Sequence, residues 1–63
     1  MSAMQARRVD VAERIGDLSA HLAVTSAVIL SPDTPLPDVL ERLKDAFALV
    51  EGLTEETETL CGL

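Results

Sequence analysis

The sequence predicts an all-α fold, an antiparallel two-helix hairpin with a helix over about residues 4–30, a proline-rich turn over 31–36 and a helix over about 37–60. On both sides of the turn, apolar residues recur at alternating spacings of three and four, as in packed helices. All three prolines fall within residues 32–37, where a helix cannot continue. The β-branched residues of 22–30 form the one rival strand candidate, and no second strand is available to pair with it.

The length of 63 residues limits the chain to a single domain, 1–63. A fold this short often needs a disulfide, a bound metal or a second subunit to be stable. Cys61 is the only cysteine and His21 the only histidine, so an internal disulfide and a structural zinc site are both excluded. We expect no metal and no cofactor. The remaining source of added stability is another chain. We therefore expect the hairpin to complete a four-helix bundle as a homodimer or with a partner protein.

Each predicted helix carries one stripe that we expect to face the other helix. The first stripe consists of Met4, Arg8, Val11, Ile15, Leu18, Leu22, Thr25 and Ile29. The second consists of Leu36, Val39, Leu43, Ala46, Val50, Leu53, Thr57 and Leu60, widened by Leu40, Phe47 and Cys61. Three apolar positions in seven are typical of a helix that faces a bundle core.

Two local features of the second helix leave alternatives open. It can begin with Thr34 as N-cap before Pro35, or at Leu36 followed by Pro37. Gly52 marks a point where the helix can bend or break, although the stripe keeps its register across the glycine.

The first helix has more apolar surface than one partner helix can cover, which marks an interaction site. We predict a protein interface on its small-residue side, where another backbone can approach closely. The predicted interface residues are Gly16, Ala20, Ala23, Val24, Ala27, Val28 and Leu30. The alternative is that alanine is present simply because it is the best helix former.

The net charge of −6 disfavours direct binding to nucleic acid or to an anionic membrane. The charge lies in the second half, because residues 32–63 hold two basic and eight acidic residues while 1–31 hold three of each. We predict an acidic partner surface at Glu51, Glu55, Glu56 and Glu58. These glutamates could instead be a solvated face, or be neutralised by Arg7 and Arg8 at the adjoining chain end.

No catalytic constellation is found in the sequence. Asp17, Ser19 and His21 are residue types of a hydrolytic triad, but within five positions of one helix they point in divergent directions. The three glycines are isolated and form no phosphate-binding loop. We therefore expect a protein that is not an enzyme.

The longest apolar stretch, residues 18–30, is too short to span a bilayer, and we expect a cytoplasmic protein. The leading functional hypothesis is a small acidic interaction module, such as an adaptor, co-chaperone or inhibitor, that binds a partner or itself through the alanine-rich face. One alternative is an obligate dimerisation or docking module of a larger assembly. Another is a phage- or plasmid-type acidic inhibitor of a nucleic-acid-binding protein, whose glutamates imitate phosphates.

Overall fold

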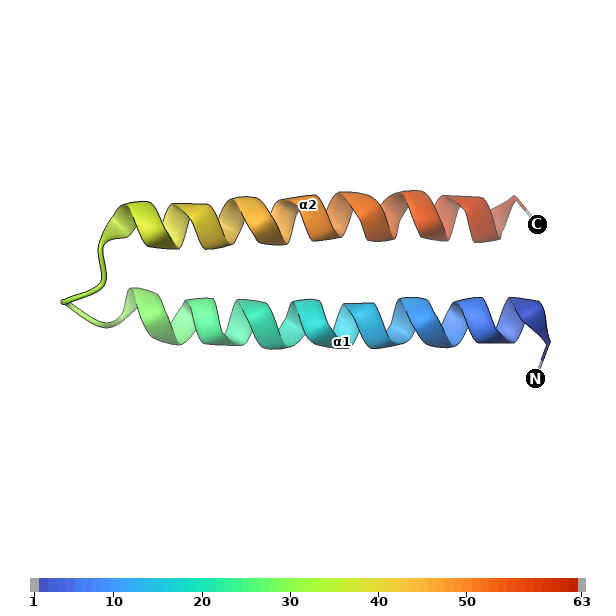
Figure 1. Cartoon of the computed structure of the whole chain (residues 1–63), viewed down its shortest axis with the longest axis horizontal. Helices are drawn as coiled ribbons and strands as arrows, with labels where there is room; N and C mark the ends of the chain where they lie inside the picture. The colour runs from blue at the N-terminus through green and yellow to red at the C-terminus, as the bar shows by residue number, and fades with distance from the viewer. Residues whose placement is uncertain (1, 63) are drawn as a thin grey trace.

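The computed structural model describes residues 2–62 and contains two helices, α1 (Ala3–Ile29) and α2 (Leu36–Cys61). The helices run antiparallel, so both chain ends lie at the end opposite the turn (Figure 1). This confirms the predicted hairpin, with helix bounds within about one residue of those expected. Residues 22–29 are helical, and no strand occurs within residues 2–62.

The helix ends follow from local hydrogen bonding. Ser2 is extended, and its hydroxyl accepts a hydrogen bond from the backbone N–H of Gln5 at 3.1 Å, which caps α1. Of the two predicted starts for α2, the one at Leu36 is correct. Pro35 is extended with ψ 132°, and it precedes the helix as a cap without a side-chain hydrogen bond. Pro37 lies in the first turn, where its missing N–H leaves no intrahelical bond unmade.

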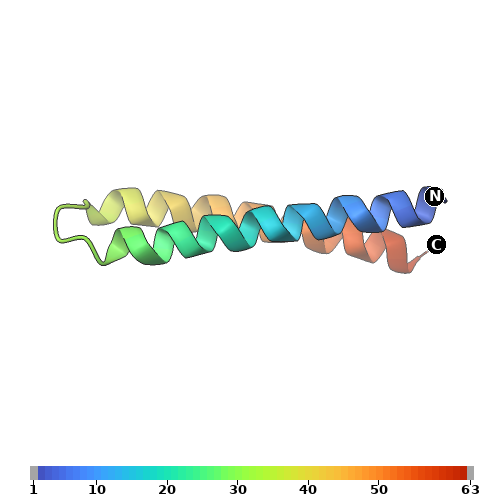
Figure 2. The same cartoon turned by 90° about the horizontal axis from the view of Figure 1, so that it is seen from below.

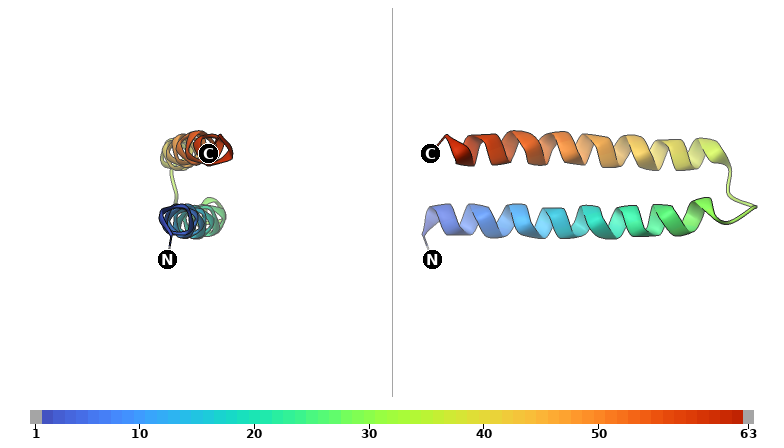
Figure 3. Two further views of the ribbon diagram at one scale, coloured as in Figure 1. Left: turned by 90° about the vertical axis from the view of Figure 1, so that its right-hand side faces the viewer. Right: turned by 180° about the vertical axis from the view of Figure 1, so that it is seen from behind.

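The hairpin is a long layer one helix thick, measuring 48 × 18 × 10 Å. Figure 2 shows that the two helices cross at a shallow angle. The end view in Figure 3 shows that, among residues 2–62, neither broad side carries a further element. The protein thus has two large flat sides, each built from one side of α1 and one side of α2.

A single line of residues at intervals of seven or fourteen is buried between the helices. Its members are Val11 and Thr25 in α1, and Val39, Ala46 and Leu53 in α2. The half-buried Met4, Leu18 and Leu60 continue the same line toward the chain termini and across its gap in α1. A seven-residue step therefore keeps a side chain on one side of its helix.

The predicted stripes are correct in one of their two rows and wrong in the other. Ile15, Leu22 and Ile29 of α1 are exposed rather than packed against α2. The same is true of Leu43 and Val50 in α2. Positions facing the partner helix are instead taken by the half-buried Arg14 and His21 of α1 and by the half-buried Arg42 of α2. Two helices touch along one line, so a stripe two rows wide cannot be buried by a single partner helix.

Gly52 does not interrupt α2, which is helical on both sides of it. A methyl group at this position would meet only the Arg14 guanidinium, at 3.6 Å from Nη2, an ordinary contact distance. The continuous helix therefore carries a glycine without needing one.

We expect Gly52→Ala to raise the free energy of unfolding by about 0.5–1 kcal/mol, because alanine has less backbone entropy to lose in a helix. Urea unfolding at one fixed chain concentration measures it. Ala48→Gly, at an exposed position of α2, serves as the reverse control and should lose a similar amount. Destabilisation by Gly52→Ala would contradict a continuous, uncrowded α2 at this point.

Candidate functional site

One flat side of the hairpin carries most of the large exposed apolar side chains, and we call it the open face. Its residues are Ile15, Leu22 and Ile29 from α1, and Leu36, Leu40, Leu43, Phe47 and Val50 from α2. Their side chains are 43–69% exposed, which is far more than a core position would be. Contiguous exposed apolar surface on this scale is typical of an interaction site.

Both helices contribute side chains to the open face because they run in opposite directions. Residues four positions after the buried line then fall on the same flank of α1 and α2, as Ile15 does after Val11 and Val50 after Ala46. Leu40, Phe47, Thr54 and Cys61 follow one another at seven-residue steps and therefore lie on the same flank of α2. Thr54 and Cys61 line a groove on that flank.

Two grooves between the helices confirm this arrangement at the end where the chain termini lie. The larger, of about 570 Å³, is lined by Met4, Arg8, Val11, Ala12, Ile15, Thr57, Leu60 and Cys61. The second, of about 320 Å³, shares Thr57 and Cys61 and adds Leu18 and Val50. The open face is therefore hollowed near the termini, where Ala12, Thr57 and Cys61 are among the groove residues, and bulky toward the turn.

The opposite flat side is mostly polar, although Leu49 is exposed on it. It holds the two side-chain hydrogen bonds that join α1 to α2 within residues 2–62. His21 Nε2 donates to the Arg42 carbonyl oxygen at 3.0 Å. Arg42 Nε donates to the Thr25 hydroxyl at 2.9 Å. That hydroxyl in turn donates to the His21 carbonyl oxygen at 2.8 Å. Side chains from both helices thus form one closed cluster, and Thr25 at its centre is buried.

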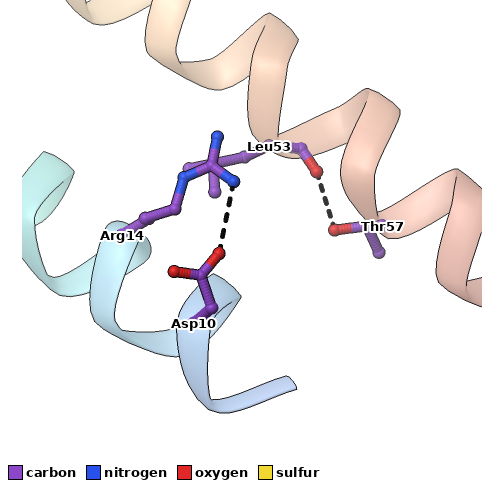
Figure 4. A network of polar contacts seen from close by, with 4 residues as sticks. All are labelled: Asp10, Arg14, Leu53 and Thr57. Carbon is purple, nitrogen blue, oxygen red and sulfur yellow. Dashed lines mark hydrogen bonds and ion pairs between the residues drawn. The ribbon is translucent and has the colours of Figure 1, made fainter. Parts of the chain in front are cut away.

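Arg14 extends the polar side toward the chain termini. Figure 4 shows its side chain reaching from α1 toward Leu53 of α2, with one guanidinium nitrogen, Nη1, 3.6 Å from Asp10 Oδ2. The same view shows the Thr57 hydroxyl, which donates to the Leu53 carbonyl oxygen at 2.7 Å. A third, small groove of about 80 Å³ is lined on this side by Arg14, Asp17, Leu49 and Leu53.

The predicted alanine-rich interface lies on a different surface from the open face. Gly16, Ala20, Ala23 and Ala27 are all exposed. They lie on the side of α1 turned away from α2, roughly half a helical turn from the buried line. Val24 and Leu30 are exposed as well, whereas Val28 is half-buried. Their role as an interface stays a prediction.

The open face does not follow from the sequence pattern, which predicts that those residues lie in the contact between α1 and α2. The available signal was the width of each stripe. Three apolar rows on α2 are more than one neighbouring helix can cover, and Leu40 and Phe47 already marked the extra row.

The structure brings together three of the four predicted acidic residues. Glu51, Glu55 and Glu58 border one shallow depression of about 320 Å³ on α2. Glu56 lies about 100° around the helix from Glu55 and is half-buried. Within residues 2–62 the ion pairs are Arg14 with Asp10 and Lys44 with Glu41, so Arg7 and Arg8 do not neutralise these glutamates.

Three further expectations can be compared with the geometry. Cys61 is exposed at the rim of the grooves, so its predicted place as a packed seam residue is wrong. No group of three or more possible metal-ligating side chains occurs in the described part of the chain. In that part, neither helix carries an apolar stretch long enough to cross a bilayer.

In comparison searches, no protein-family model, no curated protein and no solved structure matches this chain. The candidate site therefore rests on the geometry of the open face and of the polar side.

We expect Thr25→Val to lower the free energy of unfolding by about 1 kcal/mol, because Arg42 Nε loses its acceptor while the buried shape is retained. Thr59→Val is the matched control. It removes a similar hydroxyl bond, to the Glu55 carbonyl oxygen at 3.0 Å, at an exposed position. Its change should stay within about 0.5 kcal/mol. Equal effects of the two variants in chemical unfolding would contradict a stabilising role for the cross-helix cluster.

Proposed function

We propose that this protein is a non-enzymatic assembly module, which uses its open face to complete a four-helix bundle with another pair of helices. The observation that carries the proposal is the gathering of eight large exposed apolar side chains on one flat side of a two-helix layer. A layer of two helices with one apolar side is half of a bundle, and it is stable when that side is covered.

The area of the hairpin supports the same conclusion. It exposes 4727 Å². A compact monomer of this mass is expected to expose about 3,900 Å². The excess, roughly 800 Å², is what one partner contributes to an interface of standard size. The hairpin thus has the surplus surface that a stable protein complex requires.

The core of the isolated hairpin is small. Its buried apolar residues are Val11, Val39, Ala46 and Leu53, and no side chain within residues 2–62 is less than 2% exposed. Burial of apolar surface is the main favourable contribution to folding, and short chains have little of it to spare. Covering the open face would bury eight further large side chains, so association and folding are expected to be coupled.

The acidic end of α2 favours a role for charge in choosing the partner. Glu51, Glu55 and Glu58 flank the apolar surface and would lie at the rim of a complex, where charge affects the rate of encounter and specificity more than affinity. Inhibition of a nucleic-acid-binding protein by these glutamates stays a prediction of the sequence.

The test is a matched pair of charge insertions, Phe47→Glu on the open face and Ala48→Glu on the far side of the same helix. For each variant, native mass measurement gives the mass of the complex that the full chain forms in the cells that produce it. Phe47→Glu should release the free chain, because each copy loses the burial of one large side chain, about 1.5–3 kcal/mol, and gains a buried charge. Ala48→Glu should leave the complex intact.

Two results would contradict the proposed function. One is a wild-type chain that remains folded and free of any partner. The other is a complex that survives Phe47→Glu unchanged.

A further inference from the structure

We infer that the partner on the open face is a second copy of this chain, stacked face to face with its turn at the opposite end. This inference rests on the proposed function and specifies its partner. Both copies then contribute α1 against α1 and α2 against α2, each pair antiparallel. Three features of the open face favour this occupant and this orientation: its shape, its edge charges and the position of the acidic residues.

The shape of the face is complementary to itself only when the two copies point in opposite directions. At the end of the chain termini the face is hollowed by the grooves of about 570 and 320 Å³. At the turn end it carries Ile29, Leu36 and Leu40, all more than half exposed. Opposed turns place these bulky side chains of one copy over the grooves of the other. Turns at the same end would set bulk against bulk and groove against groove.

The middle of the face fits a two-fold axis. Phe47 is close to the midpoint of α2 (Leu36–Cys61) and is 64% exposed. With the axis at the level of Phe47 and Ala48, each Phe47 packs beside its counterpart. An isologous contact of this kind is the commonest way in which two identical chains associate.

The edge charges are complementary across the same axis. Lys44 and Glu51 are seven residues apart, so they share one edge of α2 and stand at equal distances from the axis. Opposed turns bring Lys44 of each copy to the level of Glu51 of the other. Within residues 2–62 Lys44 forms a loose ion pair of 3.8 Å with Glu41, in which both side chains are mostly exposed. The lysine is therefore able to reach across the interface.

The acidic residues separate the two orientations further. Glu51, Glu55 and Glu58 all lie in the half of α2 nearer the chain termini. Turns at the same end would gather these glutamates of both copies at one end of the bundle, where like charges repel. Opposed turns keep Glu55 and Glu58 of one copy about 20 Å or more along the bundle from those of the other, beyond the screening length of physiological salt. Glu51, which is nearer the axis, then stands at the level of Lys44 of the other copy.

The first experiment tests partner and orientation together, on the full chain with Cys61→Ser and a spin label on Asp33→Cys in the exposed turn. Opposed turns predict a distance between labels close to the 48 Å length of the hairpin. Turns at the same end predict labels near each other. As a control, a label on Ala48→Cys, near mid-length, should give a short distance in either orientation.

The outcomes of this experiment distinguish the inference from the proposed function. A dimer with a short distance at position 33 overturns the orientation. A purified chain that is monomeric, but joins a different protein through Phe47, overturns self-association and leaves the assembly role intact. A chain that has no partner overturns both.

The second experiment reverses the edge charges. Lys44→Glu or Glu51→Lys alone should weaken the dimer roughly tenfold, because each introduces two repulsive contacts per dimer. The double variant should restore affinity to near that of wild type. Asp45→Lys, on the far side of α2, is the matched control and should leave the dissociation constant unchanged. Sedimentation equilibrium at low salt measures the dissociation constant. Single charge reversals that leave it unchanged would overturn the placement of Lys44 beside Glu51.

Discussion

Two straight helices can touch along only one line, and this chain has more apolar surface than one line can cover. The line in the structure consists mostly of small and medium side chains, and Ala46 lies in the middle of its α2 part. Every larger aliphatic side chain of α2 apart from Leu53 and Leu60 is left exposed or to one side. The single-layer shape, the modest core and the open face all follow from this limit on what a helix pair can bury.

Which side of the hairpin becomes the open face depends on the polar cluster. Arg42 of α2 is hydrogen-bonded to His21 and to Thr25 of α1 at 3.0 and 2.9 Å, and the Thr25 hydroxyl donates to the His21 carbonyl oxygen within α1 at 2.8 Å. Polar groups at a helix contact are costly unless they are paired, so this cluster favours the one rotation of each helix that satisfies all three residues. That rotation turns Ile15, Leu22 and Ile29 outward on the other side. The hydrogen bonds on the polar side therefore determine which apolar side chains are exposed on the open face.

Much of the fold was predictable from sequence because its signals are local. Three prolines mark the turn, and the three–four spacing of apolar residues marks both helices. Continuity through Gly52 was favoured by the unbroken stripe, and α2 is continuous. The rotation of each helix was not predictable in the same way. It depends on pairing between His21 and Arg42, residues separated by 21 positions, and the pattern within one helix contains no trace of such a contact.

The candidate site shows the same limit. Heptad spacing identifies which residues are apolar on one side of a helix, but it does not state whether a neighbour in the same chain or in another chain covers them. The sequence placed Leu43 and Val50 inside the hairpin and looked for the interface among the alanines of α1. The structure leaves both residues exposed beside Phe47, which is why the open face emerges only when the two helices are assembled.

The central claim is that the hairpin is half of a bundle, whose folding depends on covering the open face. The most direct measurement is the helical circular-dichroism signal of the purified wild-type chain over a wide range of dilution. Coupled folding and self-association predict that helicity falls as the chain is diluted below its dissociation constant, and that the thermal midpoint falls with it. A helical signal and a midpoint independent of concentration, together with the mass of a single chain, would contradict the account.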